Sequence, residues 1–209
     1  TPEIVERSIE EFEYHVDMAR WMGFGKSFQD GCKINVHISG RQGPAGIIKA
    51  IPRLSPEARN LLTIENDEMG WGLESSLELE KHCALVLDIH HHWVRTGEYI
   101  QANDDRVKRV VDSWRGSRPT LHYSYSRDEH LAIANLGNKT HAEMHDIKML
   151  LARGCKKQKL RAHSDLLPNK AVNDWALSFS ENFDIQTEAK GKNMAQEQLY
   201  RQAKEKSVI

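Results

Sequence analysis

Five short apolar runs, each ending in a carboxylate or an imidazole, constrain this 209-residue chain more than any other feature. Short apolar runs of this kind are typical of buried strands. Polar side chains at the ends of buried strands are costly to desolvate unless something binds them. The five residues in question are His37, Glu65, Asp88, His122 and Glu188. Divalent cations are the usual partners of such a set, so the sequence predicts a metal site built from strand ends.

Helical patterns separate these runs. Apolar residues recur at helical spacing in the segment 2–23. We expect further helices over 47–54, 73–82, 104–114, 142–153 and 169–179. Strands that alternate with helices predict a parallel α/β sheet with helical cover. Candidate ligands at every strand end favour a closed TIM (β/α)8-type barrel over a doubly wound sheet, because barrels gather reactive groups at the C-terminal ends of their strands. Only five units are recognisable, so we expect about the last five β/α units of a barrel over residues 1–192, and a polar C-terminal helix or tail over 193–209.

The composition is that of a globular protein and bears on several functional classes. Hydrophobic residues make up 39% and charged residues 28%. No apolar run approaches the roughly 20 residues that span a membrane, so we expect no membrane association. The three cysteines share no motif spacing, which favours a reducing compartment over a disulfide framework. The formal net charge of −1 does not by itself indicate nucleic-acid binding. The sequence also indicates no obligate protein partner.

Several motifs resemble those of the UV damage endonucleases, whose barrel is related to that of endonuclease IV and xylose isomerase. The motifs are Val36-His-Ile-Ser-Gly40, Leu62-Thr-Ile-Glu-Asn-Asp-Glu68, Asp88-Ile-His-His-His92, Trp114-Arg-Gly116, His163-Ser-Asp165 and Glu188-Ala-Lys-Gly-Lys192. The resemblance runs from Pro2 to about Asn193 and covers the C-terminal portion of the family's barrel. It implies a metal-dependent DNA repair endonuclease that nicks damaged double-stranded DNA immediately 5′ to UV photoproducts with the help of manganese.

The resemblance also implies a role for each candidate metal ligand. Glu65 is expected to bridge two ions and to be a catalytic residue. The other expected ligands are Asp88, His122 and Glu188 for one ion, His37 for the second, and His91 and His163 for a third. Imidazole and carboxylate donors without thiolates suit Mn²⁺, with Mg²⁺ or Zn²⁺ as alternatives. Such ions promote attack on a phosphodiester and stabilise the leaving oxygen, so we expect two or three of them.

Three side chains beside these ligands are expected to contact DNA. Lys190 and Lys192 follow Glu188 closely and would meet phosphates as point charges. Lys190 is also a catalytic candidate. Trp93 follows the histidine run and would line the DNA groove, with burial against a helix as the alternative interpretation.

Two departures from the family pattern leave other functions open. Thr120 stands two residues before His122, where many members have a lysine, and this bears on the third ion. The family's N-terminal strands, with two further histidine ligands and a Gln-Tyr pair that probes damaged bases, have no counterpart here. The alternatives are a sugar isomerase or epimerase with the same type of barrel, and an inactive barrel fragment. A repair enzyme of this kind is expected in the cytoplasm, with the nucleoid, if the source is prokaryotic or viral, and in the nucleus if it is eukaryotic.

Two further pairs of histidines and one basic segment lie outside the predicted ligand set. His90 and His92 lie on a segment that we expect to turn, one of them supporting the metal site and the other capping a helix or facing solvent. His141 and His145 have the spacing of a zinc protease motif, but the glutamate is misplaced, so we expect no metal there. The basic run 153–161 is interpreted as a solvated loop, with DNA contact as the alternative.

Overall fold

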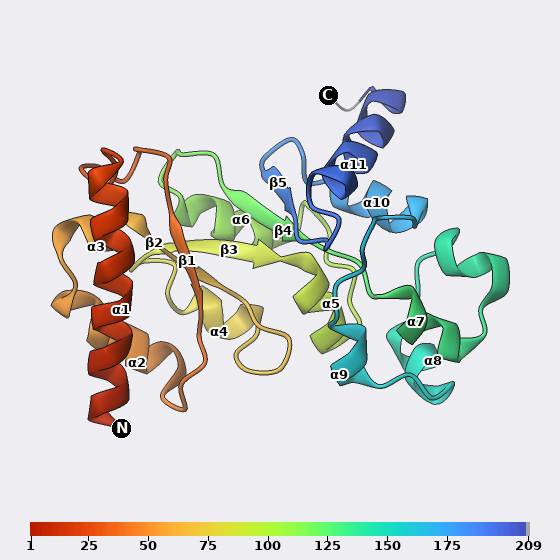
Figure 1. Cartoon of the computed structure of the whole chain (residues 1–209), viewed down its shortest axis with the longest axis horizontal. Coiled ribbons are helices and arrows are strands. Elements are labelled where there is room, and N and C mark those ends of the chain that lie inside the picture. Colours follow the sequence, from red (N-terminus) through yellow and green to blue (C-terminus); the bar gives the residue numbers. More distant parts are fainter. Residues whose placement is uncertain (208–209) are drawn as a thin grey trace. The chain divides into compact units, whose positions relative to one another are not determined.

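The computed structural model describes residues 1–207, and in these residues five parallel strands are hydrogen-bonded in the order β1-β2-β3-β4-β5 (Figure 1). The strands are β1 (Ile34–His37), β2 (Leu62–Glu65), β3 (Ala84–Asp88), β4 (Thr120–Tyr123) and β5 (Asp184–Thr187). Their order follows the chain, and every connection contains helix. This arrangement confirms the predicted alternation of strand and helix around a parallel sheet.

Helices occupy most of the connections. The α-helices are α1 (Pro2–Trp21), α2 (Gly43–Ala50), α3 (Pro56–Leu61), α4 (Leu73–Leu77), α5 (Ile89–Thr96), α6 (Asp105–Ser113), α7 (Asp128–Leu131), α8 (Ile147–Ala152), α9 (Lys157–Leu160), α10 (Lys170–Leu177) and α11 (Asn193–Glu205). The 3₁₀ helices are η1 (Ile51–Arg53), η2 (Ala132–Ala134) and η3 (Gly137–His141). Over the part of the chain that the structure describes, no helix combines the length and apolarity needed to cross a membrane.

The chain divides into two compact units. Unit 1 comprises Thr1–Val86 and Lys108–Pro119, and unit 2 comprises Leu87–Val107 and the chain from Thr120 onward. The predicted boundary at residues 192 and 193 stays a prediction. Helix α11 begins at Asn193, and the last two residues of the predicted tail lie outside the described residues.

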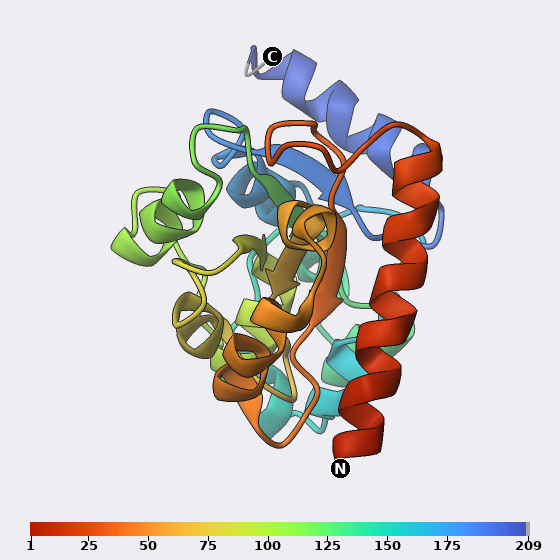
Figure 2. The same ribbon diagram turned by 90° about the vertical axis from the view of Figure 1, so that its left-hand side faces the viewer.

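Unit 1 contains α1 to α4, α6 from Lys108 onward, the paired strands β1 and β2, and the first three residues of β3. Helix α1 has Pro2 in its first turn, where the missing N–H is not needed, and it packs on α3 beside β1 (Figure 2). Strand β2 is buried throughout. It pairs with β1 so that Glu65 stands opposite His37. The indole N–H of Trp114 donates to the carbonyl of Leu85 at 2.7 Å, which ties the end of α6 to β3.

Unit 2 contains the end of β3, strands β4 and β5, and the remaining helices. The strand pairing sets Asp88 opposite His122, and His122 opposite Gln186. Helices α10 and α11 pack together, and α11 also contacts β5. In Figure 1 the short helices α7, α8 and α9 follow β4 as a separate group before the chain returns to α10.

The structure differs from the sequence expectation after β3. The segment expected to turn is helix α5, because the Asp88 side chain caps it by accepting from the His91 N–H. The helix expected over 142–153 begins only at Ile147, where Asp146 accepts a hydrogen bond from the Lys148 N–H at 2.8 Å. Capping side chains thus determine where both helices begin.

Candidate metal centre

The best-defined set of candidate ligands lies in unit 2, where Glu188 faces two imidazoles. Glu188 follows β5 directly, and His122 belongs to β4. Glu188 Oε1 lies 3.2 Å from His122 Nδ1, and Glu188 Oε2 lies 3.9 Å from His163 Nδ1. The side chains of His163 and Glu188 are 26% and 28% exposed, whereas that of His122 is 7% exposed. One carboxylate thus connects a buried imidazole with a more open one.

Backbone hydrogen bonds fix the two loops that carry His163 and Glu188. The bonds are Glu188 N–H to Tyr123 O (2.8 Å), Ser164 N–H to Tyr125 O (2.7 Å), Lys190 N–H to Ser164 O (2.9 Å) and Gly191 N–H to Asp165 O (2.7 Å). A Cβ atom on Gly191 would lie 2.4 Å from the Asp165 carbonyl oxygen, so this close approach requires glycine. The two ligand loops are therefore joined to each other and to the extension of β4.

Asp88 and His91 form a second ligand pair in unit 2. Asp88 Oδ1 accepts a 2.6 Å hydrogen bond from the His91 N–H, and Asp88 Oδ2 lies 3.7 Å from His91 Nδ1. Both residues are buried. Because one oxygen is held by the helix cap, the orientation of the Asp88 carboxylate is set by the protein before any ion binds.

His91, His163 and Glu188 come together closely enough to hold one ion. Each offers one ligand atom, and these three atoms lie within 4.8 Å of one another. Two ligands at about 2.2 Å from a shared ion are up to about 4.4 Å apart, so small side-chain rotations suffice. Imidazole and carboxylate donors fit Mn²⁺, Mg²⁺ or Zn²⁺. The residues present therefore fit the expected kind of ion.

Two predicted ligands lie together in unit 1. His37 Nε2 lies 3.5 Å from Glu65 Oε2, and His37 Nδ1 lies 3.7 Å from Asp67 Oδ2. Glu65 is 1% exposed and accepts a hydrogen bond from the Asn35 side-chain amide. The hydroxyl of Thr63 lies 3.0 Å from Asn35 Oδ1 and donates to it. Neighbouring side chains of β1 and β2 thus orient the Glu65 carboxylate.

The three predicted DNA-contacting residues differ in exposure. Lys190 and Lys192 are exposed between β5 and α11, and their contact with DNA stays a prediction. Trp93 is only 4% exposed, and its indole N–H donates to the His145 carbonyl at 3.3 Å. Its packed surroundings in unit 2 match the alternative interpretation, which is burial against a helix. Its contact with DNA stays a prediction. Thr120 begins β4 and is half-buried.

His90 and His92 are both buried, contrary to the expectation that one of them caps a helix or faces solvent. His90 Nδ1 lies 2.8 Å from the Ser124 hydroxyl, and His90 Nε2 lies 3.1 Å from the Ser126 hydroxyl. His92 Nε2 lies 2.9 Å from Glu98 Oε2. The two serines are two residues apart after β4, and this alternation was the signal in the sequence that they share a face.

His90 supports the segment that carries a candidate ligand. Its ring meets that of His163 edge to face, with centroids 5.9 Å apart, and it stacks on Trp93. Ser126 and His163 form an isolated antiparallel bridge. Burial, together with the neighbouring His91 and His163, lowers the pKa of His90 well below its ordinary value. His90 is therefore a neutral packing partner beside the candidate centre.

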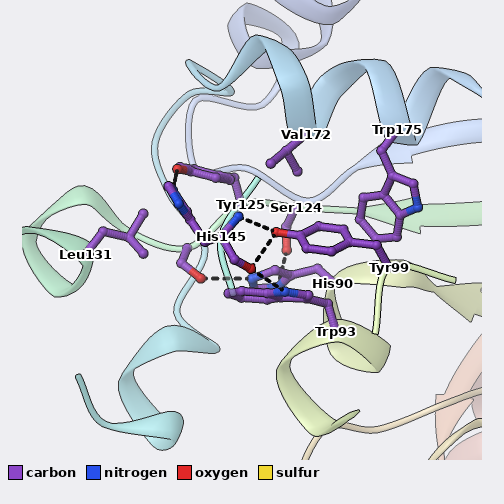
Figure 3. A pocket seen from close by; sticks show the side chains of 10 residues that line it. His90, Trp93, Tyr99, Ser124, Tyr125, Leu131, His145, Val172 and Trp175 are labelled. Atoms are coloured by element: carbon purple, nitrogen blue, oxygen red, sulfur yellow. Dashed lines mark hydrogen bonds between the residues drawn. The ribbon is translucent and has the colours of Figure 1, made fainter. Parts of the chain in front are cut away.

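An aromatic and polar network that includes His90 lines a pocket in unit 2 (Figure 3). His145 Nε2 lies 2.9 Å from the Tyr125 hydroxyl, and the Tyr99 hydroxyl accepts from the His145 N–H at 3.0 Å. The Asn169 side chain reaches the same Tyr125 hydroxyl at 3.3 Å. Burial lowers the pKa of His145 and raises those of Tyr99 and Tyr125. His145 is therefore a buried structural residue.

Known proteins that are similar in sequence to this chain are named as UV-damage endonucleases. The UV-damage endonuclease of Neurospora crassa is 26% identical over 58% of this chain and 21% of its own length. The UV DNA damage endonuclease of Bacillus cereus strain B4264 is 24% identical over 95% of this chain and 56% of its own length. The putative UV-damage endonuclease of Acanthamoeba polyphaga mimivirus is 30% identical over 58% of this chain and 39% of its own length. The chain thus spans about a fifth to just over half of the length of these relatives.

The fold and the family follow from two further comparisons. The crystal structure of SacUVDE matches 100% of this chain and 62% of that chain with a TM-score of 0.68 and 22% identity. This match, with the parallel five-stranded order, confirms the predicted α/β fold of TIM-barrel type and agrees with a partial barrel. The family model described as UV-endonuclease UvdE matches residues 1–209. The chain belongs to the UV-endonuclease UvdE family.

Proposed function

We propose that this protein is a metal-dependent DNA repair endonuclease that nicks damaged double-stranded DNA 5′ to UV photoproducts. The observation that carries the proposal is the convergence of ligand atoms from His91, His163 and Glu188 within 4.8 Å, in a member of the UvdE family. The relatives named as UV-damage endonucleases are longer than this chain. The activity is therefore proposed from the family and the ligand set together.

The proposed metal ligands divide between the two units. Those of unit 2 are Asp88, His91, His122, His163 and Glu188, and those of unit 1 are His37 and Glu65. We propose that Glu65 would hold an ion and serve as the catalytic carboxylate, with Mn²⁺ as the ion, Mg²⁺ or Zn²⁺ as alternatives, and two or three ions in all. The bound ions supply Lewis-acid stabilisation of the charge that develops around phosphorus. The chain's contribution is orientation, since the Asp88 cap and the Glu188 loop hold carboxylates in place.

The DNA strand would be held by cations close to these ligands. Lys190 and Lys192 are exposed and lie two and four residues beyond Glu188. An ammonium group near a phosphate neutralises charge without reading sequence, so both residues would position any strand. We assign Lys190 the additional catalytic role of stabilising negative charge at the incised phosphodiester, because it lies nearer to Glu188 along the chain.

A strand-incision assay tests the proposal. The protein, expressed from its full reading frame, is incubated with a UV-irradiated, end-labelled duplex and Mn²⁺. We expect incision 5′ to each photoproduct, loss of incision with a chelator, and none on the unirradiated duplex. Glu65→Gln is expected to lower the incision rate by more than about 100-fold, because even residues that only orient metal ligands are worth 10–100-fold.

Two results would contradict the proposal. Incision that is unchanged in Glu65→Gln would remove that carboxylate from the reaction. Tight metal binding without incision of irradiated DNA would favour the sugar isomerase alternative or an inactive fragment. Glu205→Gln, which makes the same charge change at the exposed end of α11, is the matched control and should leave incision unchanged.

A further inference from the structure

Positive charge is concentrated in one segment of unit 2. Between Asp146 and Asp165 the sequence has six basic residues and no acidic one, although the whole chain has a net charge of −1. The six are Lys148, Arg153, Lys156, Lys157, Lys159 and Arg161. The segment runs from α8 through α9 directly into His163, a proposed metal ligand. The local charge is therefore opposite to that of the rest of the protein and next to the candidate centre.

Two of these cations are used within the fold, and two are available to a partner. Arg153 donates to the Ala134 carbonyl at 3.0 Å, and Lys157 donates to the Arg95 carbonyl at 2.6 Å. Lys156 and Lys159 are exposed, and neither forms an ion pair with a carboxylate in residues 1–207. Neither ammonium group is therefore engaged by a carboxylate of the described residues, and both are accessible to a ligand.

The basic segment is held in a fixed position relative to His163. Leu160 is fully buried, and its carbonyl accepts a 2.6 Å hydrogen bond from the Ser126 hydroxyl. The Ala162 carbonyl accepts from the Arg127 N–H at 3.0 Å. Ser126 also bridges to His163 and contacts His90. This region is therefore an ordered extension of the site, which argues against a loosely solvated loop.

The spacing suits a nucleic-acid backbone. His163 is four positions after Lys159, so their Cα atoms are at most about 15 Å apart. That distance corresponds to about four phosphates along the axis of one strand. A strand that meets the proposed metal centre would consequently carry phosphates within reach of Lys159, and Lys156 would extend the same track.

We propose that Lys156 and Lys159 bind phosphates of the DNA strand on one side of the incision site. This inference rests on the proposed function and adds a backbone-binding surface to it. Phosphate contacts position a duplex and carry no sequence or lesion information. The contribution of these lysines to binding is therefore the same for irradiated and for unirradiated DNA.

The test compares two double substitutions with the same change in charge. Lys156→Gln/Lys159→Gln removes the proposed contacts. Lys81→Gln/Lys108→Gln is the matched control, because these exposed lysines lie before β3 and on α6, near the N-terminal ends of the strands. Affinity for a short duplex is measured with and without UV irradiation over a series of salt concentrations, and incision is measured at low salt.

We expect the Lys156/Lys159 variant to bind both duplexes more weakly, with an unchanged ratio between them. Each lost phosphate contact makes the slope of log K against log salt shallower by about 0.9, so the variant's slope should be shallower by about 2, and the control's unchanged. Equal slopes in the variant and the unsubstituted protein would overturn the inference. Failure of the unsubstituted protein to incise, with this difference in slope intact, would refute the proposed nuclease activity alone. No DNA binding by the unsubstituted protein would refute both.

Discussion

Glu188 Oε1 lies 3.2 Å from His122 Nδ1, joining the end of β5 to β4. The pairing of these strands puts the two residues near each other, and the backbone bond from the Glu188 N–H to the Tyr123 carbonyl keeps them there. The second oxygen of the same carboxylate faces His163. Glu188 therefore links two imidazoles that belong to different segments of unit 2.

Removal of the Glu188 charge is expected to weaken metal binding. Glu188→Gln should lower the affinity for Mn²⁺ by at least about 10-fold, the lower end of the effect of residues that only orient ligands. Isothermal titration calorimetry measures the affinity, with Glu205→Gln as the control for charge. An affinity equal to that of the unsubstituted protein would exclude Glu188 as a ligand.

Gly191 is expected to govern the geometry of the site without being a ligand. In Gly191→Ala the new Cβ would lie 2.4 Å from the Asp165 carbonyl oxygen, so the loops that carry His163 and Glu188 must separate. Mn²⁺ affinity should fall although every ligand is retained. Gly40→Ala is the matched control, because a Cβ there meets no atom within 4 Å. Unchanged affinity in Gly191→Ala would show that this close approach does not position the ligands.

Stability is expected to fall in mild acid because of His145. Burial lowers its pKa in the folded state, whereas the unfolded chain binds a proton near pH 6.5, at about the ordinary value. The unfolded state then holds more protons below that pH, so the contribution to the free energy of unfolding is present above about pH 6.5 and is lost as the pH falls. His145 faces Tyr125 and Tyr99, and the charged groups that act on its pKa are His141, which lowers it, and Glu143, which raises it.

Melting temperatures between pH 7.5 and 5.5, recorded with a chelator present, test this prediction. His145→Gln keeps a hydrogen-bonding side chain without a titrating group and should make the profile shallower, and the buried His90, whose pKa is also lowered, contributes to the slope that remains. His15→Gln changes an exposed histidine of α1 and should leave the profile as it is. A profile in His145→Gln as steep as that of the unsubstituted protein would assign the acid sensitivity to other groups.

Substitution of Trp93 tests whether this side chain packs in the core of unit 2 or contacts DNA. Trp93→Ala removes a side chain that is 4% exposed and stacked on His90, so the free energy of unfolding should fall by about 3–5 kcal/mol. Trp21 is 80% exposed, and Trp21→Ala should change stability by less than about 0.5 kcal/mol. Chemical denaturation measures both. A stable Trp93→Ala protein with weakened DNA binding would instead support the predicted DNA contact.

The strand ends could be predicted from the sequence because local chemistry determines them. His37, Glu65 and Asp88 are the last residues of β1, β2 and β3, and Glu188 comes directly after β5. Buried strands require apolar side chains, and a change to carboxylate or imidazole marks where burial in the sheet ends. The parallel order then follows from the helices between the strands.

Other features depend on contacts between distant segments, which local patterns do not reveal. Helix α9 has only four residues, and its position depends on the hydrogen bond between Ser126 and Leu160. The hydroxyls that hold His90 come from the extension of β4. The division into two units, which splits β3 after Val86, likewise reflects contacts made by the folded chain.

Anomalous diffraction from crystals grown with Mn²⁺ tests the central claim most directly. We predict an anomalous peak at the manganese edge within bonding distance of His91, His163 and Glu188, and its loss in Glu188→Gln crystals grown in the same way. A well-ordered structure of the unsubstituted protein in saturating Mn²⁺ without a peak among these three side chains would contradict the metal centre on which the proposed nuclease activity depends.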